Sequence, residues 1–188
     1  MSELKRVAAG FAALLVLVGA STATATAQQL ASGQAEAVGF GGGITDGGGL
    51  TFGGGIHYAY DSRWLFAGEL GYLAGGNDFA GVVQGVGVDI ESKAISVDLN
   101  AHYLFPQSSN HAFTPYLLAG LGILRASAST TVFGVSTSVS DTEAGLNIGG
   151  GARWQGGVNW GVRPEVKVFV ADNSSVRFSV GLYYQFGR

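Results

Sequence analysis

Three side chains in the segment 92–105 carry the chemical groups of a serine hydrolase. Alternation along this segment places Ser96, Asp98 and His102 on one face of a strand. A nucleophile, its base and an orienting acid act together only within hydrogen-bond reach of one another. At about 3.3 Å per residue, Asp98 and His102 would lie about 13 Å apart along the strand, too far for a relay. The sequence therefore predicts no catalytic residues, and a lipid hydrolase or acyltransferase is the least favoured of three hypotheses.

Metal and cofactor sites are not expected either. The chain has no cysteine, and its histidines (His57, His102 and His111) show no metal-ligand spacing. Three near-repeats are rich in glycine: "GFGGGI" (39–44), "TFGGGI" (51–56) and "NIGGGA" (147–152). A phosphate-binding loop needs a following Gly-Lys-Ser/Thr and a helix, and neither follows these repeats.

The first 27 residues are typical of a cleavable signal peptide. Lys5 and Arg6 precede the apolar run 7–20, and the small residues "ATA" (25–27) form a cleavage site. The apolar run is shorter than the about 20 residues that a membrane-spanning helix needs. We expect residues 1–27 to be a signal peptide and residues 28–188 to form one exported domain.

The composition narrows the class of that domain. Only 12% of the residues are charged, 32 of 188 are glycine, and 11% are aromatic. Soluble domains carry about 25% charged residues, and disordered chains contain few aromatic residues. The formal net charge is −3 and no basic block is present, so nucleic acid is not an expected partner. These features favour a transmembrane β-barrel.

Alternation supports that fold. Eight segments alternate between an apolar and a polar face and are bounded by turn residues: 36–45, 49–60, 63–73, 92–105, 114–125, 142–154, 158–171 and 175–187. Each has about the 9–11 residues that a tilted strand needs to cross a bilayer. The sequence predicts an all-β fold, an eight-stranded antiparallel up-and-down transmembrane β-barrel.

Charge and aromatic residues set the direction of the two faces. An Arg or Lys side chain facing lipid costs roughly 2–4 kcal/mol near the midplane, so the charged face should point into the lumen. The expected inward charges are four of each sign: Glu69, Asp98, Glu143, Glu165, Arg153, Arg163, Lys167 and Arg177. Opposite charges in so narrow a lumen should pair and plug it.

Aromatic residues on the apolar face gather at one end of the segments. They are Tyr58, Tyr60, Trp64, Phe66, Tyr103, Phe105, Trp154, Trp160, Tyr184 and Phe186. A belt of this kind marks a membrane interface. The connections at this end are short, and the two long connections, 74–91 and 126–141, lie at the opposite end. Short periplasmic turns and long external loops are typical of membrane barrels.

These features resemble the small eight-stranded outer-membrane β-barrels, the OmpX-like and OmpA transmembrane-domain-like family. The resemblance covers the signal "LLVLVGASTATATA" and nearly all of the mature chain, including "TPYLLAGLGILR" (114–125) and "VGLYYQFGR" (180–188). It implies a bacterial outer-membrane location, contact with outer-membrane lipids and lipopolysaccharide, and recognition by the outer-membrane assembly machinery through a terminal aromatic residue. This chain departs from the pattern, because Gly187 and Arg188 follow Phe186.

A non-catalytic structural or surface-interaction role is the favoured function, exerted by a monomer through its external loops. The alternative is a narrow pore or a route for small apolar ligands, in space left by inward glycines: Gly41, Gly43, Gly53, Gly55, Gly120, Gly122, Gly149 and Gly151. The loops 74–91 and 126–141 are the candidate partner sites. Residues 130–139 alternate around Phe133-Gly134 and, like 82–92, could extend their strands above the membrane as a hairpin. An exposed edge there could bind partner chains by strand addition, but mere loop ends without such a role are the preferred interpretation.

Overall fold

The computed structural model describes residues 32–45, 49–75, 79–83, 86–105, 113–132 and 135–186. Within them lie nine strands: β1 (Ala35–Ile44), β2 (Leu50–Ala59), β3 (Trp64–Ala74), β4 (Phe79–Val83), β5 (Val86–Leu104), β6 (Phe113–Val132), β7 (Val135–Gln155), β8 (Trp160–Val170) and β9 (Ser175–Phe186). No helix in these ranges is long and apolar enough to span a membrane. The predicted signal peptide and His111 lie outside the described residues.

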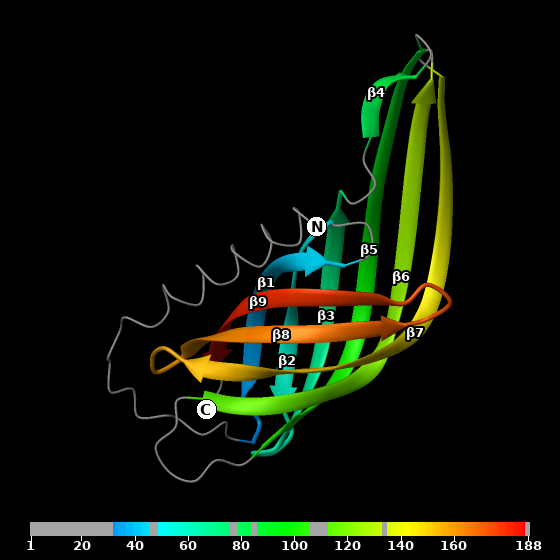
Figure 1. Ribbon diagram of the computed structural model, residues 1–188. Coiled ribbons are helices and arrows are strands. Elements are labelled where there is room, and N and C mark those ends of the chain that lie inside the picture. Colours follow the sequence, from blue (N-terminus) through cyan, green and yellow to red (C-terminus); the bar gives the residue numbers. More distant parts are fainter. Residues whose placement is uncertain are drawn as a thin grey trace.

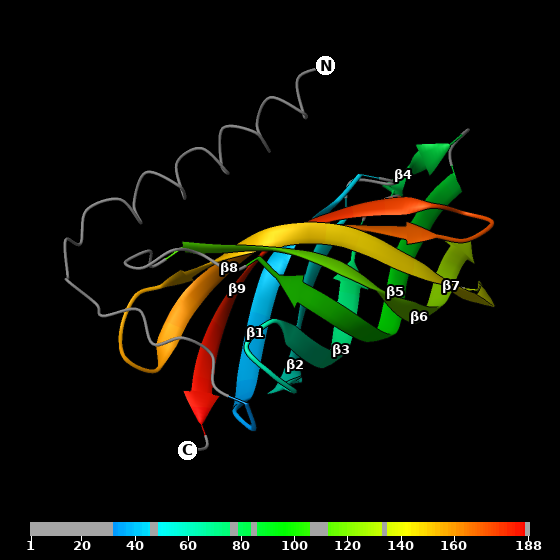
Figure 2. The ribbon, with the colours of Figure 1, turned by 90° about the horizontal axis from the view of Figure 1, so that it is seen from below.

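Eight of the strands form a closed antiparallel barrel. The strand order is β3-β2-β1-β9-β8-β7-β6-β5, and β3 pairs with β5 to close the ring. The first and last strands lie side by side, with Ala35 opposite Phe186 (Figure 2). The short β4 pairs with β5 alone. The predicted eight-stranded antiparallel barrel is confirmed.

Tight turns join the strands at the aromatic end. The Asp61 carboxylate accepts hydrogen bonds from the backbone N–H groups of Arg63 and Trp64, each at 2.7 Å, which fixes the β2–β3 turn. In the β7–β8 turn, the Gly156 and Gly157 N–H groups both donate to the Trp160 carbonyl at 3.1 Å. These turns hold the strand registers that bring the inward side chains together.

The two faces of the barrel are oriented as charge and aromaticity predict. Leucines in the middle of the strands face outward, with Leu70, Leu99 and Leu121 exposed at 62%, 65% and 63%. The predicted aromatic belt lies on this outer face, although Tyr103 and Trp154 are half-buried. Among the described residues, the fully buried side chains instead include His57, His102, Glu36 and Glu69. The barrel thus has an apolar exterior and a polar interior.

Three strands are much longer than the others. β5, β6 and β7 have 19, 20 and 21 residues, against 10 to 12 in the other barrel strands. Together with β4 they form a sheet that rises above the rest of the barrel (Figure 1). We call β4 and the ranges 86–93, 126–132 and 135–145 the projecting sheet. The expectation that 74–91 and 126–141 are connections is wrong, because most of both segments is paired strand, as the suggested hairpin extension of 82–92 and 130–139 requires. Whether the exposed edge binds a partner stays a prediction.

The expected inward position of two glycines is also wrong. Gly41 and Gly43 pair with Phe52 and Leu50, whose side chains are exposed at 55% and 69% on the outer face. Phe40 points inward instead and lies under the Arg177 guanidinium, 4.4 Å from it. The lone charge of β1, Glu36, sets this register, since a carboxylate is stable inside the barrel and not in lipid.

Two inward glycines, the predicted Gly151 and also Gly161, make room for large neighbours. A Cβ on Gly151 would lie 2.6 Å from the Tyr116 hydroxyl, and one on Gly161 would overlap the Tyr183 hydroxyl. Both tyrosines are buried inward side chains. The space that these glycines leave is therefore filled by side chains.

Candidate functional site

Among the described residues, the lumen contains eight buried charges, four of each sign. They are Glu36, Glu69, Asp98, Glu165, Arg153, Arg163, Lys167 and Arg177. Seven of them were predicted from the alternation. Since each is at most 7% exposed, its stability depends on the partners that the opposite wall supplies.

Glu69 on β3 is the centre of this network. Its Oε1 accepts a hydrogen bond from Arg163 Nη2 at 2.7 Å, and its Oε2 accepts from Arg177 Nη2 at 3.1 Å and from Lys167 Nζ at 3.3 Å. His57 Nε2 lies 3.2 Å from Oε1, while Arg163 Nη1 lies 2.9 Å from His57 Nδ1. This geometry fits a neutral His57 that donates to the carboxylate and accepts from the guanidinium.

A second carboxylate shares these cations. Glu165 Oε2 lies 3.2 Å from Arg163 Nη2, and its Oε1 accepts from Arg177 Nη2 at 3.2 Å. The Tyr116 hydroxyl donates to Oε2 at 2.8 Å. Glu69 and Glu165 therefore hold the same two arginines between β3 and β8.

On the side of the projecting sheet, Asp98 continues the network. Its Oδ2 accepts from Lys167 Nζ at 2.7 Å and lies 3.7 Å from Arg177 Nη1. Asn147 Nδ2 donates to Asp98 Oδ1 at 2.9 Å and to Asn100 Oδ1 at 3.0 Å. These bonds tie β5 to β7, β8 and β9 across the lumen.

A separate pair crosses the lumen at the aromatic end. Arg153 on β7 forms a two-pronged ion pair with Glu36 on β1, in which Nη1 donates to Oε2 at 3.1 Å. Gln185 Nε2 donates to Glu36 Oε1 at 3.0 Å, and the Arg153 guanidinium lies 4.5 Å from the centre of the Tyr183 ring. Bidentate Arg–carboxylate pairs are among the strongest side-chain contacts.

Glu143 was expected in the lumen and is not part of the network. It has the predicted inward position on β7, but it lies at the mouth of the barrel and accepts a hydrogen bond from Asn173 in the β8–β9 turn at 2.5 Å. Glu36, which the sequence reasoning missed, supplies the fourth inward acid instead.

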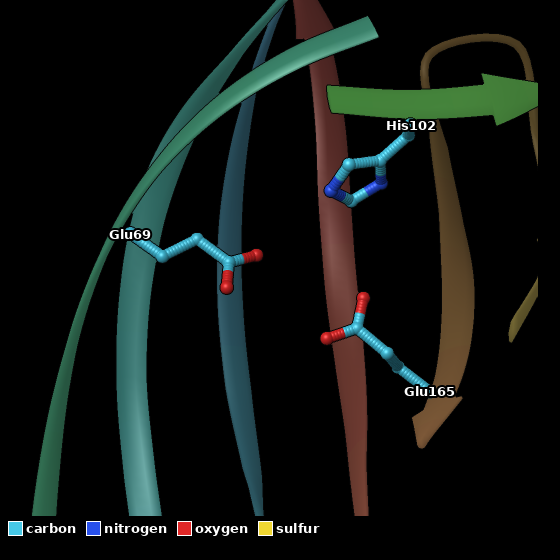
Figure 3. Close-up of side chains that lie close together, drawn as sticks. All are labelled: Glu69, His102 and Glu165. Carbon is cyan, nitrogen blue, oxygen red and sulfur yellow. The ribbon is translucent and has the colours of Figure 1, made fainter. Parts of the chain in front are cut away.

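Glu69, His102 and Glu165 point toward one another from three strands (Figure 3). One possible ligand atom from each lies within 4.8 Å of the others, which is close enough to consider a metal ion. His102 stacks on Tyr116 at 5.1 Å between ring centres, and both of its ring nitrogens lack a hydrogen-bond partner among the described residues. Each carboxylate is already bound by arginines, however, and a divalent cation would meet Arg163 and Lys167 at the same place. The donor set therefore fits ion pairs better than a metal.

Ser96, Asp98 and His102 share the inward face, as predicted. Ser96 Oγ lies 3.5 Å from Asp98 Oδ2, but His102 has no hydrogen bond to either residue. Asp98 is held by Lys167 and Asn147 instead. The three side chains do not form a hydrolase triad.

The comparisons with known proteins agree with this architecture. Residues 11–186 match the family model described as outer membrane protein beta-barrel domain. The chain belongs to the outer membrane protein β-barrel domain family. Its place is therefore the bacterial outer membrane, as the resemblance implied. No curated protein matches the chain significantly.

Solved structures of other outer-membrane β-barrels have the same fold. The N-terminal β-barrel domain of Pseudomonas aeruginosa OprF is 18% identical with a TM-score of 0.58, covering 84% of this chain and 100% of that domain. Ail of Yersinia pestis is 19% identical with a TM-score of 0.59, covering 82% of this chain and 99% of Ail. A major outer membrane protein of Thermus thermophilus is 14% identical with a TM-score of 0.61, covering 81% of this chain and 99% of that protein.

Proposed function

We propose that this outer-membrane barrel is a non-catalytic surface-interaction protein that binds extracellular partner proteins through its projecting sheet. The observation that carries the proposal is the edge of β7. Residues 135–145 pair with β6 on one side, whereas β8 joins the other side of β7 only from Leu146 onward. An unpaired strand edge offers a row of N–H and C=O groups to which an extended segment of another protein can add.

The side chains along this edge favour such pairing. Natural proteins protect exposed edges with Lys, Pro or inward charges. From Ser136 to Ser140 the edge carries neither charge nor proline, and Asp141 is the first acid. Ser136 is also hydrogen-bonded to Thr131 on β6 at 2.8 Å between hydroxyl oxygens, which helps to keep the hairpin extended.

The charge of the β6–β7 hairpin in the projecting sheet, residues 126–132 and 135–145, supports a protein partner over a polyanion. Ail of Yersinia pestis was solved in complex with the heparin analogue sucrose octasulfate. A sulfated polymer needs clustered cations, and the paired ranges 126–132 and 135–145 contain no Lys or Arg. Backbone pairing and hydroxyl contacts are the interactions that the uncharged edge of this hairpin, residues 136–140, offers.

A narrow pore or a route for apolar ligands receives less support. The network around Glu69 and the Glu36–Arg153 pair cross the lumen at two levels, and Phe40, Tyr116 and Tyr183 fill space beside the glycines. A cavity of about 40 Å³ lies between Asp98, Lys167 and neighbouring side chains. It is too small for a ligand of ordinary size.

The test compares a lysine substitution on the exposed edge strand β7 with the same substitution on the neighbouring strand β6. Thr137 on β7 pairs with Thr130 on β6, so the two side chains share a face but only Thr137 is on the edge. Cells that display wild type, Thr137→Lys or Thr130→Lys are assayed for adhesion to a panel of immobilised purified extracellular proteins, with surface amounts matched by heat-modifiable gel mobility. We expect wild type to bind at least one protein, Thr137→Lys to lose about tenfold, and Thr130→Lys to keep most binding. Wild-type binding no stronger than that of cells without the protein, or equal loss in both variants, would contradict edge recognition.

A further inference from the structure

Two cations lie together on the outer face of the barrel wall. Lys93 on β5 pairs with Ser127 on β6, and Ile95 pairs with Arg125, so Lys93 and Arg125 are diagonal neighbours on one face of the sheet. Such neighbours lie about 7–8 Å apart, within the reach of two long side chains toward one anion. Both are exposed, and neither forms an ion pair with a side chain that the structure describes.

The position of the pair corresponds to a membrane surface. Below it on the outer face lie Ile95, Val97 and Leu99 of β5, all strongly exposed apolar side chains. Lys93 is ten residues from Tyr103 of the aromatic belt on β5. That separation is about 33 Å along a strand and about 25 Å across the bilayer at the usual tilt, equal to the apolar band of membrane barrels. The cations therefore lie at the headgroup level of the leaflet opposite the aromatic belt.

Hydroxyl groups complete the donor set. Ser127 is opposite Lys93, and Thr142 of β7 is opposite Arg125, on the same face. Asp141 pairs with Ala126 and thus has the opposite face. The acidic position nearest to Lys93 on β5 is Glu91, which pairs with Ser129 two residues nearer the tip of the sheet. An ammonium, a guanidinium and two hydroxyls are well suited to the oxygens of a phosphate group.

We propose that Lys93 and Arg125 bind a phosphate of an outer-leaflet lipid headgroup, which in a bacterial outer membrane belongs to lipopolysaccharide. Long external strands mark this end of the barrel as the outer one. Cations at the membrane surface attract anionic headgroups, and the arginine fork adds two directed hydrogen bonds. The bound lipid would anchor the base of the projecting sheet to the membrane surface.

The test uses the full mature chain refolded in detergent micelles. Purified lipid A and its enzymatically dephosphorylated form are titrated separately, and bound lipid is measured by native mass spectrometry. We expect wild type to prefer phosphorylated lipid A by about tenfold or more, and Lys93→Gln with Arg125→Gln to remove that preference. The swapped pair Lys93→Arg with Arg125→Lys should keep it, which separates lost charge from lost folding. Arg63→Gln, an exposed cation in the β2–β3 turn at the other end of the barrel, should keep it as well.

Three outcomes would overturn the proposal. The first is that the double Gln variant still prefers phosphorylated lipid A, and the second is that Arg63→Gln removes this preference equally. The third is that inorganic phosphate at millimolar concentration displaces lipid A from the wild-type protein. The last result would mean that the site takes free phosphate and not a lipid headgroup.

Discussion

Glu69 gathers donors from three strands around one carboxylate, because His57, Arg163, Lys167 and Arg177 come from β2, β8 and β9. Glu69→Gln would leave three buried cations with only two carboxylates, Asp98 and Glu165, so one positive charge would be unbalanced. Breaking a buried pair in this way costs about 3–5 kcal/mol. We expect a loss of that size in the free energy of unfolding, measured by reversible urea unfolding in lipid vesicles.

Glu143 provides the matched control for the same chemical change. Its carboxylate is at the barrel mouth and accepts from Asn173 alone among the hydrogen bonds of the described residues. Exposed polar pairs contribute less than about 1 kcal/mol. Glu143→Gln should therefore shift the unfolding free energy by less than that amount, and equal losses in the two variants would refute the central role of Glu69.

The faces of individual residues could be predicted from the sequence, but their depth in the barrel could not. Alternation identified the inward position of Glu69 and of six other lumen charges, because period 2 is a local property. Glu143 has the same alternation, yet it lies at the mouth of the barrel, where its carboxylate bonds to Asn173 in the β8–β9 turn and not to a lumen cation. The inward position of Glu36 could have been predicted, because a single charge in an otherwise apolar strand must face the lumen. Using it would have placed Gly41 and Gly43 outward.

At the scale of strands, Gly151 on β7 leaves the space that the Tyr116 side chain of β6 occupies. A Cβ at Gly151 would meet the Tyr116 hydroxyl at 2.6 Å and would also overlap the Pro164 carbonyl, which cannot move without the β8 backbone. Overpacking of this kind costs about 1–3 kcal/mol. Gly151→Ala should lower the urea midpoint accordingly.

Gly39→Ala is the control for Gly151→Ala. Gly39 faces outward on β1, and nothing lies within 4 Å of a Cβ built there. Its substitution should change stability by less than about 0.5 kcal/mol. If Gly39→Ala destabilised the barrel as much as Gly151→Ala, the loss would reflect strand propensity and not the tyrosine contact.

The length of β5, β6 and β7 was the part of the fold that the sequence indicated least clearly. Inside the membrane, one face of a strand meets lipid and the other meets the lumen, so the two faces differ in polarity. Above the membrane both faces meet water, and the Ser- and Thr-rich residues 126–132 and 136–142 show no contrast between them. Strand pairing continues there through backbone hydrogen bonds, which leave no mark on the polarity pattern.

At the scale of the whole molecule, closure of the ring creates contacts that no local pattern encodes. Glu36 and Arg153 are 117 residues apart in sequence and meet because β1 and β7 face each other across the lumen. The sequence predicted that inward charges would balance and pair, but which pairs form depends on the registers of all eight strands. The central position of Glu69 has the same origin.

Those pairs also determine whether ions can pass through the barrel. Lys167–Asp98 joins β8 to β5, Arg177–Glu69 joins β9 to β3, and the Glu36–Arg153 pair closes the aromatic end. An ion would have to break buried ion pairs at both levels, each costing several kcal/mol. We expect the folded wild-type monomer in a planar bilayer to show no steady open-channel current, while a large porin added to the same bilayer gives stepwise current. A persistent current from wild-type protein whose folded state is verified by heat-modifiable mobility would show that the ion pairs do not plug the lumen, and would favour the narrow pore over the surface-interaction role.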